Sequence, residues 1–134
     1  MNPQHVQIGD ALPSIIKNVS LEKMSQPLMA LKNPLHYDQA FSAQNGLRAP
    51  IAAGMMSCAY LSEMLTKIFG AAWLNGSQFN TTFIQPVFAG DTITAKGVVR
   101  TVETTPSGKR VTVDVWCENQ TGEKVTVGEA IITI

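Results

Sequence analysis

The sequence has few charged residues and no excess of either sign. Lysine and arginine number 10, aspartate and glutamate number 10, and charged residues make up 15% of the 134 positions. Because such a balance creates no field of one sign over the surface, we expect neither nucleic acid nor membrane as a partner. Soluble domains usually carry about 25% charged residues. The shortfall predicts that another subunit covers part of the apolar surface, in a homodimer or a higher oligomer.

Cysteine is also scarce, and long apolar runs are absent. The two cysteines, Cys58 and Cys117, stand in apolar surroundings without the spacing of a metal site, so we interpret both as reduced thiols of the core and expect no bound metal. No segment reaches the roughly 18 consecutive apolar residues of a membrane span. The N-terminus lacks the pattern of a signal peptide. These absences predict a cytoplasmic protein.

Prolines interrupt the first third of the chain, where we expect only short elements. The pattern predicts a strand near residues 14–19 and a short helix at residues 39–44, capped by Asp38. Residues 53–69 differ, because their apolar side chains recur at steps of three and four and the run ends at Gly70. This spacing predicts one long helix. Its faces are nearly all apolar or small, so other elements should surround it.

Four segments rich in valine, threonine and isoleucine follow this helix. Polar and apolar residues alternate along them, as in strands, and turn residues separate them. The predicted strands span residues 77–84, 91–103, 110–118 and 124–134. The last three form an antiparallel meander, and the early strand joins it as a fifth. The sequence thus predicts one α+β domain over residues 1–134, with a five-stranded antiparallel sheet wrapped around one long central helix.

Three short motifs stand at the borders of these elements. Asn-Pro-Leu-His occupies residues 33–36, Pro-Ile-Ala-Ala-Gly-Met occupies residues 50–55, and Pro-Val-Phe-Ala-Gly-Asp occupies residues 86–91. In this order and spacing they resemble the MaoC-like dehydratases, the family of the (R)-specific enoyl-CoA hydratases. The resemblance runs from about Asn33 to the end of the chain. It implies the hot-dog fold and an acyl-CoA thioester as substrate, without a separate cofactor.

The resemblance also implies a reaction, the interconversion of a trans-2-enoyl-CoA and a 3-hydroxyacyl-CoA. In this family an Asp and a His hold and deprotonate a water molecule, and a glycine N–H meets the negative charge that develops on the thioester oxygen. Here the family pattern implies His36 as the base and acid and Gly54 as the N–H donor. It also brings in Asn33, which alternatively fixes the loop, and Ser62, which alternatively bonds to its own helix backbone.

One family residue is missing. Counting back from His36, the position of the catalytic Asp holds Leu31, and a leucine cannot hold or polarise water. The nearby Asp38 is better suited to capping a helix. Three functions therefore stay open: a hydratase whose carboxylate is lost or supplied from elsewhere, an impaired acyl-CoA-binding subunit that forms a heterodimer with a catalytic hot-dog subunit, and an acyl-CoA thioesterase. The thioesterase would need a carboxylate on the central helix, where Glu63 is the only one.

Overall fold

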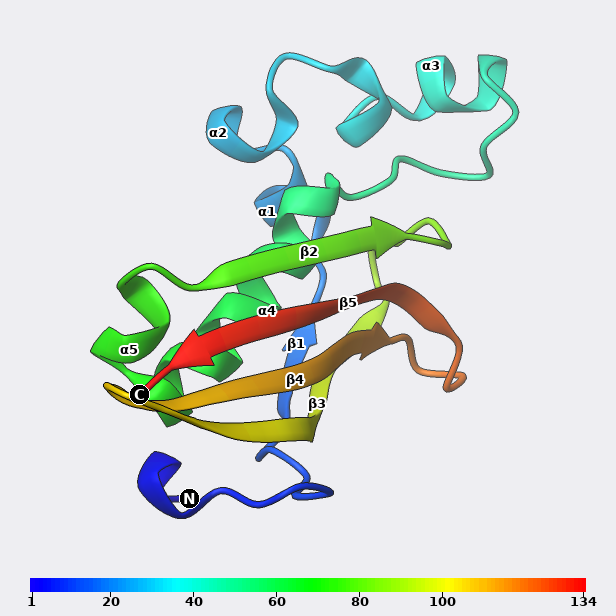
Figure 1. Ribbon diagram of the computed structural model, residues 1–134. Helices are drawn as coiled ribbons and strands as arrows, with labels where there is room; N and C mark the ends of the chain where they lie inside the picture. Colours follow the sequence, from blue (N-terminus) through cyan, green and yellow to red (C-terminus); the bar gives the residue numbers. More distant parts are fainter.

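A long helix lies against a single antiparallel sheet in the computed structural model, which describes residues 1–134 (Figure 1). The strands are β1 (Ile15–Asn18), β2 (Gln78–Phe83), β3 (Thr92–Thr105), β4 (Gly108–Glu118) and β5 (Lys124–Thr133). The helices are α1 (Leu21–Met24), α2 (Pro27–Ala30), α3 (Gln39–Gln44), α4 (Gly54–Phe69) and α5 (Ala71–Leu74), and 3-10 turns occupy Pro3–His5 and Pro34–His36. Every predicted strand and the long helix are present. The short helices α2 and α5 were not predicted.

The strand order in the sheet is β1-β3-β4-β5-β2. Strands β3, β4 and β5 form the predicted meander, and β1 pairs with β3 as the fifth strand. Strand β2 precedes the meander in the chain but pairs with β5, so that Phe83 lies opposite Thr126. This crossing places the end of β2 beside the start of β5. The outer side of β2 has no neighbouring strand and forms a free edge of the sheet.

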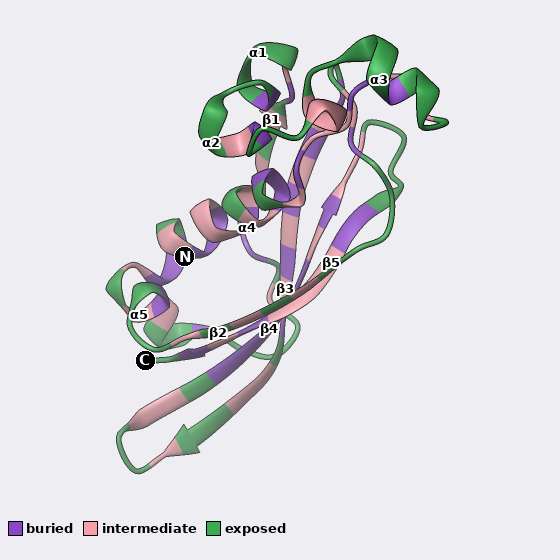
Figure 2. Cartoon of the chain, turned by 90° about the horizontal axis from the view of Figure 1, so that it is seen from above, coloured by how far each residue is buried: buried purple, intermediate pink, exposed green.

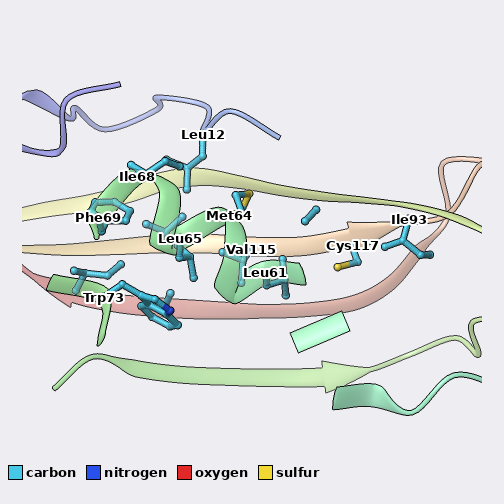
Figure 3. Close-up of a cluster of buried hydrophobic side chains, with 14 of the residues drawn as sticks. Leu12, Leu61, Met64, Leu65, Ile68, Phe69, Trp73, Ile93, Val115 and Cys117 are labelled. Atoms are coloured by element: carbon cyan, nitrogen blue, oxygen red, sulfur yellow. The ribbon is translucent and has the colours of Figure 1, made fainter. Parts of the chain in front are cut away.

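Helix α4 buries one face against the sheet. Leu61, Met64 and Leu65 have no exposed surface and lie between α4 and the strands (Figure 3). Burying a side chain of this size contributes roughly 1.5–3 kcal/mol. The opposite face, with Met55, Ala59 and Lys67, is exposed. The expectation that other elements surround α4 is therefore met on one face only, because a single sheet curls around one side of a helix.

Both cysteines are free thiols, as predicted. Cys117 on β4 is completely buried, and Cys58 on α4 is partly buried. Burial raises the pKa of the Cys117 thiol to about 12, because the thiolate would lose its hydration. Cys117 thus acts as a small apolar residue of the core.

The short helices α1, α2 and α3 gather beyond one end of the sheet, near the N-terminus of α4 (Figures 1 and 2). Their surfaces are mostly exposed (Figure 2). The cap of α3 is the predicted one, since Asp38 Oδ1 accepts a hydrogen bond from the Phe41 N–H at 3.0 Å. Ser20 Oγ accepts from the Lys23 N–H at the start of α1. No helix of this chain has the length and apolarity needed to cross a membrane.

Candidate active site

A cavity of about 380 Å³ opens where four segments of the chain meet. Its walls come from His36 in the loop before α3, from residues 51–54 and Ser57 around the start of α4, from residues 83–87 at and beyond the end of β2, and from Thr126 on β5. The crossing of β2 to the far edge of the sheet creates this meeting point. The cavity therefore contains two of the predicted site residues, His36 and Gly54.

The loop holds His36 in one orientation. Asn33 Oδ1 accepts a hydrogen bond from the Leu35 N–H at 3.1 Å and so fixes the 3-10 turn that carries the histidine. The Nδ1 atom of His36 lies 2.7 Å from the carbonyl oxygen of Ile51. Because a carbonyl oxygen only accepts, Nδ1 carries the hydrogen in this contact. In the neutral imidazole Nε2 is then the nitrogen without a hydrogen, and no protein group hydrogen-bonds to it. This tautomer can accept a proton from water.

The start of α4 presents backbone donors to the same cavity. The N-cap residue, Ala53, has no side chain that could accept from the first turn, and the N–H groups of Gly54 and Met55 donate to no protein acceptor. The Ala52 N–H donates to the Val87 carbonyl at 2.7 Å and fixes the entry to the helix. Free N–H groups and the dipole of a 16-residue helix both favour negative charge at this end. An oxyanion can be stabilised here.

A side chain at position 54 would require the Phe83 ring to move. A Cβ atom built on Gly54 would overlap the ring of Phe83, which packs directly on the glycine backbone. Phe83 also forms part of the cavity wall. The packing role and the donor role that the sequence left open are therefore compatible at this residue.

Other sequence candidates lie outside the cavity. Ser62 Oγ accepts a hydrogen bond from the Trp73 indole Nε1 at 2.8 Å, which ties α4 to α5. It does not bond to its own helix backbone, the alternative that the sequence suggested. Asn33 holds the histidine turn and does not line the cavity. The contact of Ser62 depends on where α5 places Trp73, and the local sequence gives no signal for that.

No aspartate or glutamate lines the cavity. Glu63 forms ion pairs with Lys17 at 2.7 Å and Lys67 at 3.3 Å. The hydrogen bond from Lys17 lowers the pKa of the Glu63 carboxyl group below its ordinary value. Asp38 caps α3. Neither carboxylate that the sequence singled out is thus available in this cavity, and no group of His, Cys, Asp and Glu side chains is arranged to hold a metal ion.

Leu31 has an unfavourable backbone conformation. It ends α2 with φ 51° and ψ 33°, in the left-handed region, and the next residue, Lys32, has φ 59°. Leucine has no local hydrogen bond to offset the steric cost of this region, about 1–2 kcal/mol, whereas asparagine and aspartate adopt it more readily. The Leu31 side chain is 59% exposed and does not line the cavity. The backbone at this position suits asparagine or aspartate better than leucine.

Sequence reasoning missed two hydroxyl residues of the cavity. Ser57 and Thr126 line it and are only 4% and 1% exposed. A faint signal existed for Ser57, because residues three apart on a helix share a face and Gly54 was already a candidate. For Thr126 no local signal exists, since its place depends on the pairing of β5 with β2.

Comparisons with known proteins cover most of the chain. The model of the MaoC like domain matches residues 31–121. The (R)-specific enoyl-CoA hydratase from Aeromonas caviae is 30% identical over 105 residues, which make up 76% of this chain and 75% of that protein. The solved (R)-hydratase from A. caviae involved in PHA biosynthesis has a TM-score of 0.81 and 26% identity, covering 98% of each chain. Unliganded R-hydratase PhaJ1 from Pseudomonas aeruginosa has a TM-score of 0.78 and 27% identity, covering 96% of this chain and 81% of that one. These similarities confirm the predicted hot-dog fold.

Proposed function

This chain belongs to the MaoC-like domain family, and on that premise we propose that it interconverts a trans-2-enoyl-CoA and a 3-hydroxyacyl-CoA. The observation that carries the proposal is the shared cavity of His36 Nε2 and the free N–H groups at the start of α4. A base and an oxyanion donor in one cavity are what the addition of water to an enoyl thioester requires. The reaction needs no cofactor beyond the CoA of the substrate.

Each group has one role in the proposed reaction. The thioester oxygen accepts from the Gly54 N–H, where the helix dipole favours the negative charge of an enolate. His36 Nε2 takes a proton from water as its oxygen bonds to C3 of the acyl chain. The same nitrogen then returns the proton to C2. Asn33 contributes indirectly, because its side chain fixes the turn that carries His36.

The proposal includes a second copy of this chain as partner. The exposed face of α4, with Met55 and Ala59, lies on the side of the helix away from the core, and β2 offers a free strand edge. Phe83 and Ile84 at the end of β2 are 55% and 46% exposed. Apolar side chains next to an unpaired edge favour association. Sedimentation equilibrium should therefore give a mass of at least twice 14.5 kDa, and a monomer at micromolar concentration would contradict this part.

An acyl-CoA-binding subunit without activity of its own is the second candidate. Two observations favour it, the leucine at position 31 and the lack of any carboxylate in the cavity. Such a chain would pair with a catalytic hot-dog subunit in a heterodimer. The purified protein alone would then bind enoyl-CoA but not hydrate it. A thioesterase has less support, because Glu63 is held in ion pairs outside the cavity.

One assay separates these functions. The purified chain is mixed with crotonyl-CoA and with longer enoyl-CoAs, and the loss of enoyl absorbance and the release of free thiol are followed separately. We expect hydration without thiol release. The His36→Ala variant should lose the activity by a factor of about 100 or more, because general base catalysis contributes about 10²–10⁴-fold. Thiol release without hydration would overturn the proposal in favour of the thioesterase.

A further inference from the structure

Two nearly buried residues with hydroxyl groups, Ser57 and Thr126, line the histidine cavity, and neither hydroxyl makes a hydrogen bond within the protein. We propose that Ser57 and Thr126 hold the water molecule that His36 deprotonates, in place of the carboxylate that Leu31 lacks. The inference rests on the hydratase function proposed above. It concerns the orientation of the attacking water, the one step to which the proposed reaction assigns no residue.

These two residues are nearly buried, but their hydroxyl oxygens keep some open surface, since the fully buried oxygens without a partner are those of Tyr60 and Thr105. Ser57 is 4% exposed and Thr126 is 1% exposed, yet neither Oγ atom makes a hydrogen bond within the protein. The large majority of buried side-chain polar groups have a partner. Thr66, two and a half turns further along α4, shows the usual solution, because its hydroxyl donates to the Ser62 carbonyl at 2.7 Å. Ser57 forgoes that bond although a helix carbonyl is within reach at the same spacing.

The positions of the two hydroxyls suit a shared water. Ser57 follows Gly54 by three residues, so both lie on one face of the first turn of α4. Thr126 approaches from β5, opposite the end of β2, and His36 approaches from the loop. His36, Ser57, Thr126 and Gly54, with its free N–H, therefore line the same cavity of about 380 Å³. A buried water normally takes two to four hydrogen bonds from such polar groups.

The chemistry of a hydroxyl fits the task of orientation. A serine or threonine oxygen accepts one hydrogen bond from water and can donate another, but it does not take up the proton at neutral pH. The water then donates one hydrogen to His36 Nε2 and the other to a hydroxyl oxygen, which leaves a lone pair for C3 of the acyl chain. The oxygen bonds to C3, the double-bond electrons move to the thioester oxygen near Gly54, and His36 returns the proton to C2. Nothing is oxidised or reduced.

The test measures hydration of crotonyl-CoA by the full chain and by Ser57→Ala and Thr126→Val. Losing one oriented hydrogen bond to the water should lower kcat about 10- to 100-fold for Ser57→Ala, with KM unchanged within about twofold. Thr126→Val, which keeps the shape of the side chain, should lower kcat in the same way. Thr66→Val is the matched control, because it removes a hydroxyl of α4 that is bonded to the backbone and lies outside the cavity. Its kcat should equal that of the unmodified protein.

A rescue distinguishes orientation of water from packing. Adding Leu31→Asp to Ser57→Ala should restore kcat by a larger factor than Leu31→Asp raises it in the unmodified protein, since carboxylate and hydroxyl would serve the same step. Circular dichroism and the melting temperature show that each variant is folded. An active parent whose kcat survives both Ser57→Ala and Thr126→Val overturns the inference alone. An inactive parent overturns the proposed function, and the inference with it; a rise in KM at constant kcat assigns the hydroxyls to binding and also overturns it.

Discussion

The loop that carries His36 and the start of α4 meet in one cavity but are built in opposite ways. The loop region, residues 20–48, consists of short helices with mostly exposed surfaces, and two of its non-glycine residues, Leu31 and Lys32, have left-handed backbone conformations. The start of α4 is held by the Ala52 hydrogen bond and by the Phe83 ring, and the helix continues into the core. The oxyanion side of the site is thus part of the fold. His36, the proposed base, instead lies on the short elements outside the core.

This difference means that the two sides of the cavity tolerate substitution differently. Position 31 contributes no buried side chain, so the packing of the core sets no limit on its identity. Gly54 has no such freedom, because any side chain would overlap Phe83. Residues on loops tolerate change, and residues of the scaffold do not. The family features that this chain retains lie mainly on the scaffold side.

The largest effect is expected from a substitution on the scaffold side of the cavity, at Gly54. In Gly54→Ala the new methyl group must displace either the Phe83 ring or the helix start. Displacement of catalytic groups by about 1 Å can cost about 100-fold in rate, so kcat/KM for crotonyl-CoA should fall by about that factor. The N–H donor itself is kept in this variant. The loss of kcat/KM therefore measures how strongly the reaction depends on the position of this N–H group.

A second substitution controls the first. Phe83→Ala in the Gly54→Ala background removes the overlap, and a large part of the activity should return. Phe83→Ala alone reports the cost of opening the cavity wall. If the double variant is no better than Gly54→Ala, the close contact between ring and glycine is not what requires glycine at this position.

On the loop side, Leu31→Asp should increase both activity and stability. A carboxylate can orient water next to His36, and we expect kcat to rise about tenfold or more. Aspartate also adopts the left-handed region more readily than leucine, so the free energy of unfolding should rise by about 1 kcal/mol. Steady-state kinetics and urea denaturation measure the two effects.

Leu31→Asn separates the carboxylate from the backbone effect. Asparagine has nearly the shape of aspartate and equally favours the left-handed region, but carries no charge. It should give the gain in stability without the gain in kcat. Equal kcat values for the two variants would mean that position 31 lies out of reach of the reaction in this chain.

The sequence was most informative where structure depends on near neighbours. The cap at Asp38 and the exit at Gly46 bounded α3, and the apolar period with Gly70 bounded α4 within one residue. The turn residues between the last three strands predicted their antiparallel meander. These features follow from side chains a few positions apart, whose preferences survive in the folded protein.

The site was less predictable, because it depends on contacts between distant segments. His36 and Gly54 were found through motifs, and the structure brings both to one cavity. Ser62 instead accepts a hydrogen bond from Trp73, which α5 positions. Thr126 could not be found, since the pairing of β5 with β2 alone places it. Hydroxyl groups are also common, and nothing in the sequence marks one as lacking a partner in the fold.

The smallest expected effect concerns the contact between α4 and β1, far from the loop. Glu63 bonds to Lys17 of β1 and to Lys67, and these contacts lower its pKa below the ordinary value of 4.5. A carboxyl group whose pKa is lower in the folded protein stabilises the fold above its unfolded pKa, and this contribution is lost as the pH falls through the folded pKa. Glu63→Gln should therefore lower the free energy of unfolding at pH 7 by less than about 1 kcal/mol, because the pair is partly exposed and screened by solvent.

Two further measurements control the Glu63→Gln prediction. One is the dependence of the stability difference on pH and salt, and the other is the hydration activity of the variant. As the pH falls through the lowered pKa of Glu63, the parent carboxyl group becomes protonated, so the two proteins should converge in stability. Added salt should also narrow the difference. Hydration of crotonyl-CoA by Glu63→Gln at pH 7 should equal that of the parent protein, because the ion pairs lie outside the cavity. If this variant lost activity, Glu63 would have to act in the site. The thioesterase hypothesis, which needs a carboxylate on the central helix, would then regain support.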